Sequence, residues 1–445
     1  MARYTKEDIF RIVEEEDVEF IRLQFCDIFG LPKNVAVTAG QLERVLDHEY
    51  YFDASGIEGF RDTLHEMVLY PDLNTFDIYP WRPQTGKVAR MYCDIYTAEG
   101  EPFAGDSRQV LRRILRKAEQ QGYYFDIQPE LEFFLFHTDD EGRPTTTTHE
   151  SAGYFDIAPS DLAENVRRDI ILTLEEMDFE VLGSHHELAP AQHEIDFAGG
   201  RADRVADQVI TFRQAVRTVS KKHGLYATFM PKPCAGSNGS GMHLHIQCRD
   251  AMGKNLFADP SGDGQLSGLA RHFAAGLLAH APGMTLFANP LVNSYKRLVH
   301  GFDAPTVICW SDILANRFAY MNIPVQTGDR ARIELRSPDG VCNPYLVFAL
   351  CLAAGLDGVE NQLEPAPVIH ENLADRTYTE LRQQGLLTLP ETLGESIDAS
   401  LADPLVRSVL GDQIFTGYVK AKRQEWKEFR TEVTNWEIEN YLKKY

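Results

Sequence analysis

The sequence predicts an α+β protein in which a small mixed domain precedes a much larger α/β domain. Two observations predict this division. Residues 20–25 and 87–96 alternate between apolar and polar side chains, as strands with one buried face do. Long segments with apolar residues at helical spacing begin only after the second of these strands. We place the boundary near residue 105, which gives domains 1–105 and 106–445.

The first domain opens with a helix and continues with strands. Thr5 and Asp8 have the spacing of a capping box, and Ile9 and Val13 give the helix that follows an apolar face. The tripeptide Gly-Leu-Pro at 30–32 indicates a turn between two strands.

The second domain is predicted to contain three amphipathic helices. Their apolar positions are Val110, Leu111, Ile114, Leu115 and Ala118 in the first, Leu162, Val166, Ile170 and Leu174 in the second, and Val205, Val209, Phe212, Val216 and Val219 in the third. Gly122 supplies a stop signal for the first helix. Strand-like segments that carry polar residues two positions apart lie between these helices and beyond them.

Composition excludes several classes of protein. The chain has 445 residues, a net charge of −22 and a pI near 5.1, which argues against a nucleic-acid partner. Its seven cysteines form no C-x-x-C pair, which is typical of free thiols in a reducing compartment. No apolar signal segment is present near the N-terminus, and the apolar stretch at 341–356 is too short to span a bilayer. We expect a cytoplasmic protein without a membrane partner.

One predicted strand, QPELEFFLF at 128–136, contains two carboxylates within an apolar run. Glu130 and Glu132 point to the same face of the strand, because side chains alternate between the two faces. Burial of two neighbouring ionised carboxylates is unfavourable unless a cation lies between them. A Glu-x-Glu pair alone most often lies on a solvated face, but the four apolar residues that follow this pair argue against that interpretation.

Other segments repeat this pattern. His243 and His245 share one face of GMHLHIQ (241–247). The strand ARIELRS (331–337) has a polar face formed by Arg332, Glu334 and Arg336, and the segment at 184–197 supplies Glu187 and Glu194.

Together these groups suggest a metal site. The five glutamates and one histidine are too many acceptors for two arginines to balance, and they suit two hard cations, Mg²⁺ or Mn²⁺. Two such cations neutralise phosphate charge in phosphoryl transfer. The alternative for His245 is a buried histidine whose hydrogen bonds are satisfied, and His185 and His186 are expected to have structural roles. No single pair of these residues indicates a metal site, but their combination does.

A glycine-rich turn, KPCAGSNGSGMH at 232–243, precedes the histidine strand and allows the backbone to approach a ligand closely. It matches neither a Walker A loop nor a dinucleotide-binding fingerprint.

With these segments identified, the chain closely resembles glutamine synthetase of the bacterial type I class. The matching stretches include YPDLNTFDIYPW (70–81), PELEFFLF (129–136), HHELAPAQHEIDF (185–197), NGSGMH (238–243), NPLVNSYKRL (289–298) and RIELRS (332–337). The resemblance implies an N-terminal β-grasp domain and a glutamine-synthetase-type α/β catalytic domain. It also implies a homododecamer of two stacked hexameric rings, in which neighbouring subunits share each active site.

The reaction that the resemblance implies is an ATP-dependent ligation in glutamine biosynthesis. ATP phosphorylates the γ-carboxylate of glutamate, and ammonia then attacks the γ-glutamyl phosphate to give glutamine, ADP and phosphate. By similarity, one metal is held by Glu132, Glu187 and Glu194, and the second is held by Glu130, His243 and Glu334.

The resemblance assigns the other site residues as well. Arg297 clamps the α-carboxylate of glutamate, Asn238 and Gly239 line the glutamate site, and Arg336 faces the γ-carboxylate and the transferring phosphoryl group. The nucleotide is contacted by Arg317 and Arg332, with His245 nearby. Asp53 of a neighbouring subunit, Asp303 and Tyr154 form the acceptor site, where Asp303 takes a proton from the incoming ammonium.

The sequence departs from the family around the acceptor. The segment FDASGIEGF (52–60) has Ala54 and Gly56 where the family has Gly and Ser, and VHGFDAP (299–305) has His300 for Pro and Asp303 for Glu. A lost hydroxyl and a shorter carboxylate enlarge the pocket. The alternative function is therefore a γ-glutamyl-amine ligase that uses methylamine, ethanolamine or a polyamine such as putrescine.

A second departure concerns the nucleotide. Asn322 replaces an arginine of the family, and Gln247 replaces a serine. Loss of a phosphate-facing cation weakens ATP binding unless Arg330 compensates, so a regulatory homologue with little activity is a further alternative. Arg61 matches an arginine linked to feedback control in one subclass.

Two rival functions come from other classes. A two-metal hydrolase would use the same carboxylates but would not need Arg297, Arg336 and Asn238 as an amino-acid clamp. A purely regulatory ring would tolerate loss of Glu130 or His243, whereas an enzyme would not. The residues favour the ligase.

Overall fold

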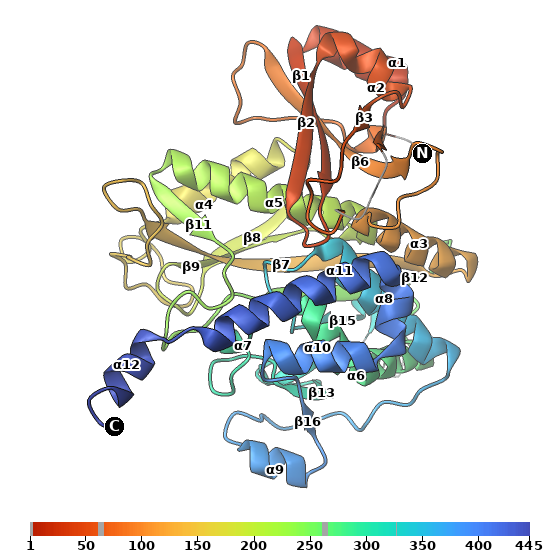
Figure 1. Ribbon diagram of the computed structural model, residues 1–445. Helices are drawn as coiled ribbons and strands as arrows, with labels where there is room; N and C mark the ends of the chain where they lie inside the picture. Colours follow the sequence, from red (N-terminus) through yellow and green to blue (C-terminus); the bar gives the residue numbers. More distant parts are fainter. Residues whose placement is uncertain (1–2, 61–65, 260–265, 326) are drawn as a thin grey trace.

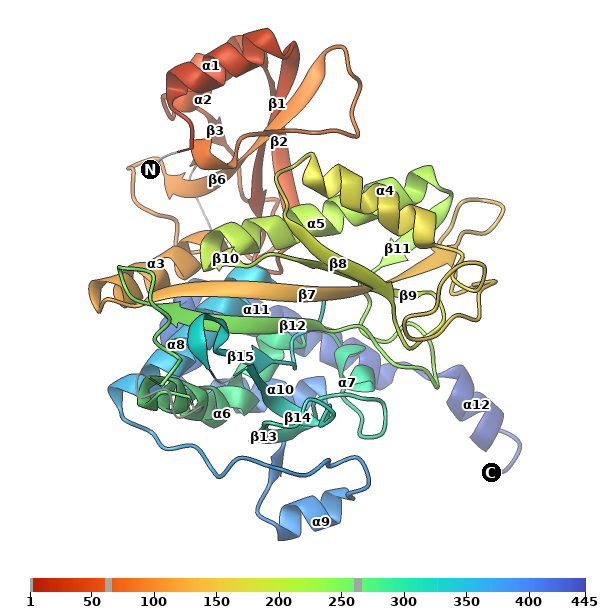
Figure 2. The same cartoon turned by 180° about the vertical axis from the view of Figure 1, so that it is seen from behind.

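A computed structural model describes residues 3–60, 66–259, 266–325 and 327–445. Arg61, to which the sequence assigned a link with feedback control, lies outside the described residues. Figures 1 and 2 show a small N-terminal domain standing on a larger one that holds most of the helices.

The small domain is a mixed sheet in the order β2-β1-β6-β4-β3, with β5 also paired to β6. Its strands are β1 (Val18–Cys26), β2 (Pro32–Thr38), β3 (Tyr51–Phe52), β4 (Met67–Pro71), β5 (Asp77–Ile78) and β6 (Lys87–Thr97). Helix α1 (Lys6–Glu15) has the predicted capping box at Thr5 and Asp8, and α2 (Leu42–Leu46) follows β2. Strands β1 and β6 run parallel at the centre of this sheet, as in a β-grasp fold.

Alternation of side chains explains why β1 forms here. Ile21, Leu23 and Phe25 are buried in the core of the small domain. The turn after β1 contains Gly30 at a φ of 77°, a conformation that few other residues adopt readily.

The large domain is organised around a sheet in the order β16-β13-β14-β15-β12-β7-β9-β8, with β10 and β11 also paired to β7. Its strands are β7 (Tyr124–His137), β8 (Val181–His186), β9 (Gln192–Phe197), β10 (Gly200–Arg201), β11 (Leu225–Thr228), β12 (Met242–Arg249), β13 (Val307–Ser311), β14 (Ala319–Val325), β15 (Arg332–Leu335) and β16 (Leu387–Thr388). The long strand β7 lies in the middle and carries the two glutamates that the sequence singled out.

Helices cover this sheet and complete the core. They are α3 (Ser107–Gln120), α4 (Glu164–Glu175), α5 (Ala202–Lys222), α6 (Gly268–Ala288), α7 (Ser294–Arg297), α8 (Pro344–Glu360), α9 (Tyr378–Gln383), α10 (Leu393–Ala402), α11 (Pro404–Thr431) and α12 (Asn435–Tyr441). The predicted boundary at residue 105 lies between β6 and α3. One helix differs from its prediction: α4 begins only at Glu164, so Leu162 precedes it and is 59% exposed.

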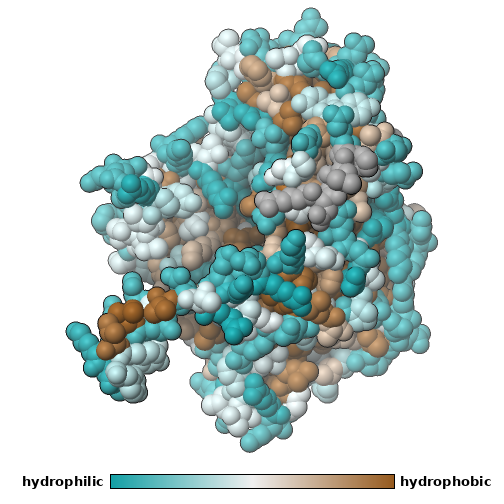
Figure 3. Space-filling view, viewed as in Figure 1, coloured by the Kyte–Doolittle hydropathy of each residue, from teal (hydrophilic) through white to brown (hydrophobic). Residues whose placement is uncertain are grey.

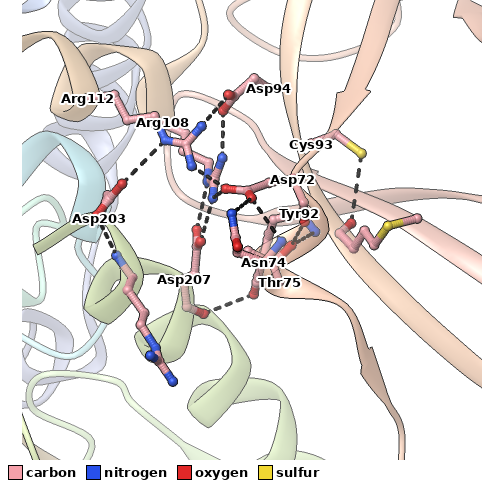
Figure 4. Close-up of polar contacts among 12 residues, drawn as sticks. Asp72, Asn74, Thr75, Tyr92, Cys93, Asp94, Arg108, Arg112, Asp203 and Asp207 are labelled. Atoms are coloured by element: carbon pink, nitrogen blue, oxygen red, sulfur yellow. Dashed lines mark hydrogen bonds and ion pairs between the residues drawn. The ribbon is translucent and has the colours of Figure 1, made fainter. Parts of the chain in front are cut away.

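A buried network of charges joins the two domains (Figure 4). Arg108 of α3 donates to Asp94 on β6 at 2.7 Å, to Asp207 on α5 at 2.9 Å and 2.7 Å, and to Asp72 at 2.8 Å. Arg112 contacts Asp72 and Asp94 from the next turn of α3. Because the carboxylates come from both domains, these contacts fix α3 and α5 beneath the small sheet.

The C-terminal helix α12 projects away from the body of the chain, and Figure 3 shows apolar side chains at this projection. Val433, Trp436 and Leu442 are more than half exposed there. Within the described part of the chain, no helix, α12 included, is both long enough and apolar enough to cross a membrane.

Candidate active site

The metal-binding residues that the sequence predicted meet at the centre of the large sheet. Strand pairing places Glu130 of β7 opposite His243 of β12 and Glu132 opposite Glu194 of β9. On the other side of β12, His245 pairs with Glu334 of β15. Residues that pair across adjacent strands point to the same face, so these side chains share one face of the sheet.

A cavity of about 280 Å³ opens above this face. It is lined by all six predicted metal ligands, namely Glu130, Glu132, Glu187, Glu194, His243 and Glu334. Tyr154, Asn238, Gly239, Arg297, Asp303, Arg317 and Arg336 line it as well. The described chain therefore gathers residues from widely separated segments around one space.

The carboxylates in this cavity repel one another. Burial, together with the charge on Asp196, raises the pKa of Glu194 well above its usual value, and burial and Glu187 raise the pKa of Glu132. Burial and Glu130 raise the pKa of Asp196 to about 7. A cation among these oxygens would relieve the repulsion, so this donor set fits Mg²⁺ or Mn²⁺.

Two other carboxylates have local partners. Burial alone would raise the pKa of Glu130, but hydrogen bonds with His243 and His245 outweigh it and hold this pKa below its usual value. The Nε2 atom of His245 lies 2.5 Å from Glu130, and Arg336 donates to Glu334 at 2.5 Å. Glu130, His243 and Glu334 each offer one ligand atom within 4.8 Å of the others.

Arg297 is a buried cation without a carboxylate partner among the described residues. It is 4% exposed, and it donates to the carbonyl oxygens of Ser337 at 2.8 Å and Arg336 at 3.1 Å. A Cβ atom at Gly239 would lie 2.2 Å from the carbonyl oxygen of Pro231 and 3.1 Å from Cγ of Arg297. The cavity therefore has a guanidinium in its wall, and a glycine lets the backbone approach it.

The loop with Asp303 closes one side of the cavity. Asp303 has a φ of 51° and lies 3.4 Å from the amide of Asn238 and 3.5 Å from Arg317. The neighbouring Phe302 lies under the ammonium of Lys232, which is 3.8 Å from the centre of the ring. These contacts join the loop to the glycine-rich turn at 232–243.

A second cavity, of about 320 Å³, lies beyond His245. Arg330, Arg332, Gln247 and Arg249 line it with His245. Arg332 donates to Nδ1 of His245 at 3.1 Å, so His245 connects Arg332 to Glu130. Arg317, which the sequence grouped with His245 and Arg332, lines the first cavity beside Tyr154 and Asp303 instead.

Asp53 lies outside both cavities. It is fully exposed in the small domain, where it accepts a hydrogen bond from the backbone N–H of Ser55 at 2.8 Å. Asn322 lies on β14 opposite Glu334, is 1% exposed, and has no hydrogen-bond partner for either amide atom within the described structure.

Some residues of the site were not identified from the sequence. Gln192 donates to Glu132 at 2.7 Å and to the carbonyl of Gly239 at 3.1 Å. Asp196 is paired with Glu130 across β9 and β7. The alternation in HEIDF indicated that Asp196 shares a face with Glu194, whereas nothing in the sequence indicated the contact of Gln192.

A third cluster, formed by Glu150, His186 and His193, has the composition of a metal site. Its hydrogen bonds, however, involve the atoms that would have to bind the metal. Arg167 donates to Nδ1 of His193 at 2.9 Å, so the proton of that ring must be on Nε2, the atom a metal would need. His186 pairs with Glu150 at 3.0 Å, and hydrogen bonds with Glu150 and the carbonyl of Glu187 overcome burial and raise its pKa. This cluster is an ion-paired structural group.

Comparison with known proteins gives consistent matches along the chain. Residues 17–98 match the family described as "Glutamine synthetase, beta-Grasp domain", and residues 104–441 match "Glutamine synthetase, catalytic domain". A protein of Clostridium saccharobutylicum named glutamine synthetase is 50% identical over the full length of both chains. Its namesake from Thermus thermophilus is 48% identical over 99% of this chain and 100% of its own.

Among solved structures, one titled "GmaS/ADP complex-Conformation 1" superimposes with a TM-score of 0.88. It is 30% identical, and the match covers 98% of this chain and 99% of that one.

Proposed function

Since the chain belongs to the glutamine synthetase family and is an ATP-dependent glutamate ligase, we propose that it joins ammonia to the γ-carboxylate of L-glutamate through γ-glutamyl phosphate. One observation supports this most strongly. Five glutamates and His243 converge beside a buried arginine that has no carboxylate partner within the described residues. This combination suits an amino-acid substrate and a phosphoryl group in one cavity.

Glutamate is held by the arginine side of the cavity. Arg297 clamps the α-carboxylate, because its guanidinium is already fixed by two backbone carbonyls and needs an anionic partner. Asn238 and Gly239 line the substrate, and Arg336 faces the γ-carboxylate and the phosphoryl group. A cation at the transferring oxygens stabilises the charge that develops there.

The metals are Mg²⁺ or Mn²⁺, which suit oxygen ligands. Glu132, Glu187 and Glu194 hold one, and Glu130, His243 and Glu334 hold the other. When bound, they neutralise the charge of the phosphate oxygens.

ATP enters from the second cavity, where Arg332 and His245 contact it. Arg330 lines the same cavity and supplies a cation in place of the one that Asn322 no longer provides. The regulatory alternative is therefore less well supported than an active enzyme. Arg317 lies beside Tyr154 and Asp303 in the first cavity. Its proposed contact with the nucleotide is therefore made at the γ-phosphate, the group that is transferred.

The acceptor binds beside Asp303. This carboxylate attracts ammonium and removes the proton that makes its nitrogen a nucleophile. Tyr154 lines the same side, and Asp53 of a neighbouring copy completes the site. That arrangement requires an oligomer, for which we propose a dodecamer of two hexameric rings in the cytoplasm; the exposed apolar side chains of α12 are available for contact between copies.

A primary amine is the second candidate acceptor. Leu188, Phe302 and Leu314 line the cavity and add apolar surface to it. Among the described residues, no heavy atom lies within 4 Å of the position that a Cβ atom would take at Gly56. The solved structure titled "GmaS/ADP complex-Conformation 1" has the same fold at 30% identity. Ammonia remains the proposal because the relatives named glutamine synthetase are much closer in sequence.

Phosphate release from ATP, glutamate and Mg²⁺ distinguishes these acceptors. Ammonium, methylamine, ethanolamine and putrescine are supplied singly, and kcat/KM is measured for each. The highest value with ammonium supports the proposal. A preference of about tenfold or more for an amine, roughly 1.4 kcal/mol, makes the chain a γ-glutamyl-amine ligase. No release with any acceptor supports a regulatory homologue.

A further inference from the structure

Gln192, the first residue of β9, lies between the carboxylates of the candidate active site and its glycine-rich turn. It is 1% exposed and forms part of the wall of the first cavity. Its Oε1 atom accepts the backbone N–H of Ala189 at 3.2 Å, so the side-chain amide has one orientation only. The N–H groups of Nε2 therefore point toward Glu132 and Gly239, and both accept from it.

The hydrogen bond to Glu132 involves a carboxylate proposed to hold a metal. Nε2 of Gln192 lies 2.7 Å from Oε2 of Glu132, and the backbone N–H of Gly241 donates to the same oxygen at 3.1 Å. The other oxygen, Oε1, lies 3.9 Å from Nε2 of His243, too far for a hydrogen bond. Two donors thus hold one oxygen in place and leave the other available to a cation.

The hydrogen bond to Gly239 reaches the turn that packs on Arg297. Nε2 of Gln192 donates to the carbonyl of Gly239 at 3.1 Å. A Cβ atom at Gly239 would lie 3.1 Å from Cγ of Arg297, and one at Gly241 would lie 2.5 Å from its Nη2. A shift of the turn therefore changes the space beside the guanidinium that is proposed to clamp glutamate.

The backbone of Gln192 contacts a second proposed metal ligand. Its carbonyl oxygen accepts the N–H of Glu187 at 2.8 Å, and its own N–H donates to the carbonyl of Ala189 at 3.0 Å. Glu187 lines the cavity together with Glu132. One residue therefore contacts two of the three proposed ligands of one metal and, in addition, the glutamate turn.

We infer that Gln192 is a positioning residue that couples cation binding at Glu132 to glutamate binding beside Gly239. The inference rests on the proposed function. With a cation bound, the carboxylate of Glu132 has one position, and the amide of Gln192 that is bonded to it holds the carbonyl of Gly239 in one position as well. Each ligand therefore orders a part of the site that the other needs, so each raises the affinity of the other.

The affinity of each ligand in the presence of the other measures this coupling without turnover. Mn²⁺ is titrated into the protein without ATP, and the free ion is followed by electron paramagnetic resonance, with and without L-glutamate. A titration without protein corrects for chelation of Mn²⁺ by glutamate. Calorimetric titration of L-glutamate with and without Mn²⁺ gives the reciprocal value. We expect a factor of about fivefold or more in the wild type, and the same factor in both experiments, because coupling between two sites is reciprocal.

Variants of Gln192 test whether this residue carries the coupling. Gln192→Met has a similar size but no donor, and we expect its coupling factor to fall below about twofold. Gln192→Glu keeps an oxygen that accepts from Ala189 but also lacks the donor, so it serves if the methionine variant does not fold. Gln24→Met, the matched control, replaces a glutamine of the small domain that is 3% exposed, and it is expected to keep the coupling of the wild type.

The coupling factor distinguishes a positioning role from a structural one. A structural role weakens the binding of both ligands to Gln192→Met but leaves the coupling factor unchanged, and that result would overturn the inference. Binding of both ligands to the wild type without coupling would overturn it as well. If the wild type binds neither Mn²⁺ nor glutamate, the proposed function itself is contradicted, and the inference falls with it.

Discussion

In the proposed reaction, Asp303 is the side chain on which the acceptor chemistry depends most directly. Replacing it by Asn removes the base but keeps the size and a hydrogen-bonding group. We expect kcat/KM for ammonium to fall by about 10²–10⁴, the usual contribution of a general base, while KM for ATP changes little. Steady-state kinetics measure both. Asp312→Asn, a half-buried aspartate that pairs with His370 at 3.0 Å, is the matched control. A variant of Asp303 within twofold of wild type would exclude the proposed base.

Arg330 is the residue proposed to bind the phosphates of ATP in place of the family's arginine at position 322. It lines the second cavity without an ion pair to a described residue, whereas Arg249 in the same cavity pairs with Asp126 at 3.1 Å and Asp329 at 2.7 Å. Arg330→Gln is therefore expected to raise KM for ATP by about tenfold or more, as loss of a charged hydrogen bond does. Arg249→Gln has a smaller effect on KM. The opposite order would show that Arg330 does not replace the missing arginine.

The residues that line the candidate site were predictable from the sequence to the extent that short motifs contain them. Glu130, Glu132 and His243 stand in strands whose alternation fixes the direction of each side chain. Gln192 was missed because its hydrogen bond to Glu132 depends on the register between β7 and β9. Arg317, which the resemblance assigns to the nucleotide, lines the first cavity and not the second, and its motif does not specify which cavity the side chain enters.

At the scale of elements, α3 is held by the charge network of Arg108. Arg108→Met leaves Asp72, Asp94 and Asp207 with one cation fewer in a buried place. Breaking such a network typically destabilises a protein by about 3–5 kcal/mol, so we expect a clearly lower urea midpoint. Arg116 lies on the exposed side of α3, and Arg116→Met is expected to change stability by no more than about 0.5 kcal/mol. Equal midpoints for the two variants would contradict this role.

The same network predicts a dependence of stability on pH. Burial alone would raise the pKa of Asp72, but Arg108 and Arg112 outweigh it and hold this pKa below the ordinary value of 3.8. The stabilisation is therefore present above pH 3.8 and is lost as the pH falls further. Thermal unfolding measured from about pH 5 down to about pH 2, a range that spans the titration of an aspartate, records this loss. In Arg108→Met the slope is smaller, and an unchanged slope would assign the acid sensitivity to other groups.

Most elements were predictable because their patterns are local. The capping box of α1 and the apolar faces of α3 and α5 match the structure. Strands β1 and β6 form where they were predicted, but β6 is buried on both faces and does not alternate. The start of α4 was predicted wrongly. Leu162 fits the helical period, but it lies before the first helical residue and is exposed.

At the scale of the whole molecule, the proposed oligomer makes each active site a product of two chains. Asp53→Asn and Glu334→Gln are each expected to be nearly inactive. When the two variants are co-expressed in equal amounts, a site that takes Asp53 from one copy and Glu334 from the next is intact in about a quarter of cases. Activity near a quarter of wild type is therefore expected. Activity no higher than that of either variant alone would mean that the two residues act within one chain or that the copies do not mix.

Two features of the single chain, the exposed Asp53 and the exposed apolar side chains of α12, concern the proposed assembly. Asp53 is exposed and distant from both cavities, and α12 projects with apolar side chains outward. The proposed oligomer accounts for both features through contacts between copies. No sequence pattern within one chain specifies these contacts, because they depend on surfaces brought together only by symmetry.

The most direct measurement follows the oxygen atoms of glutamate. Glutamate labelled with ¹⁸O in its γ-carboxylate is incubated with ATP, Mg²⁺ and ammonium, and the released phosphate is analysed by mass spectrometry. If the γ-carboxylate attacks ATP and ammonia then displaces phosphate, one labelled oxygen leaves the carbon with each phosphate. We predict one ¹⁸O per phosphate released. Unlabelled phosphate would mean that water attacks ATP, and it would identify a hydrolase that does not activate glutamate.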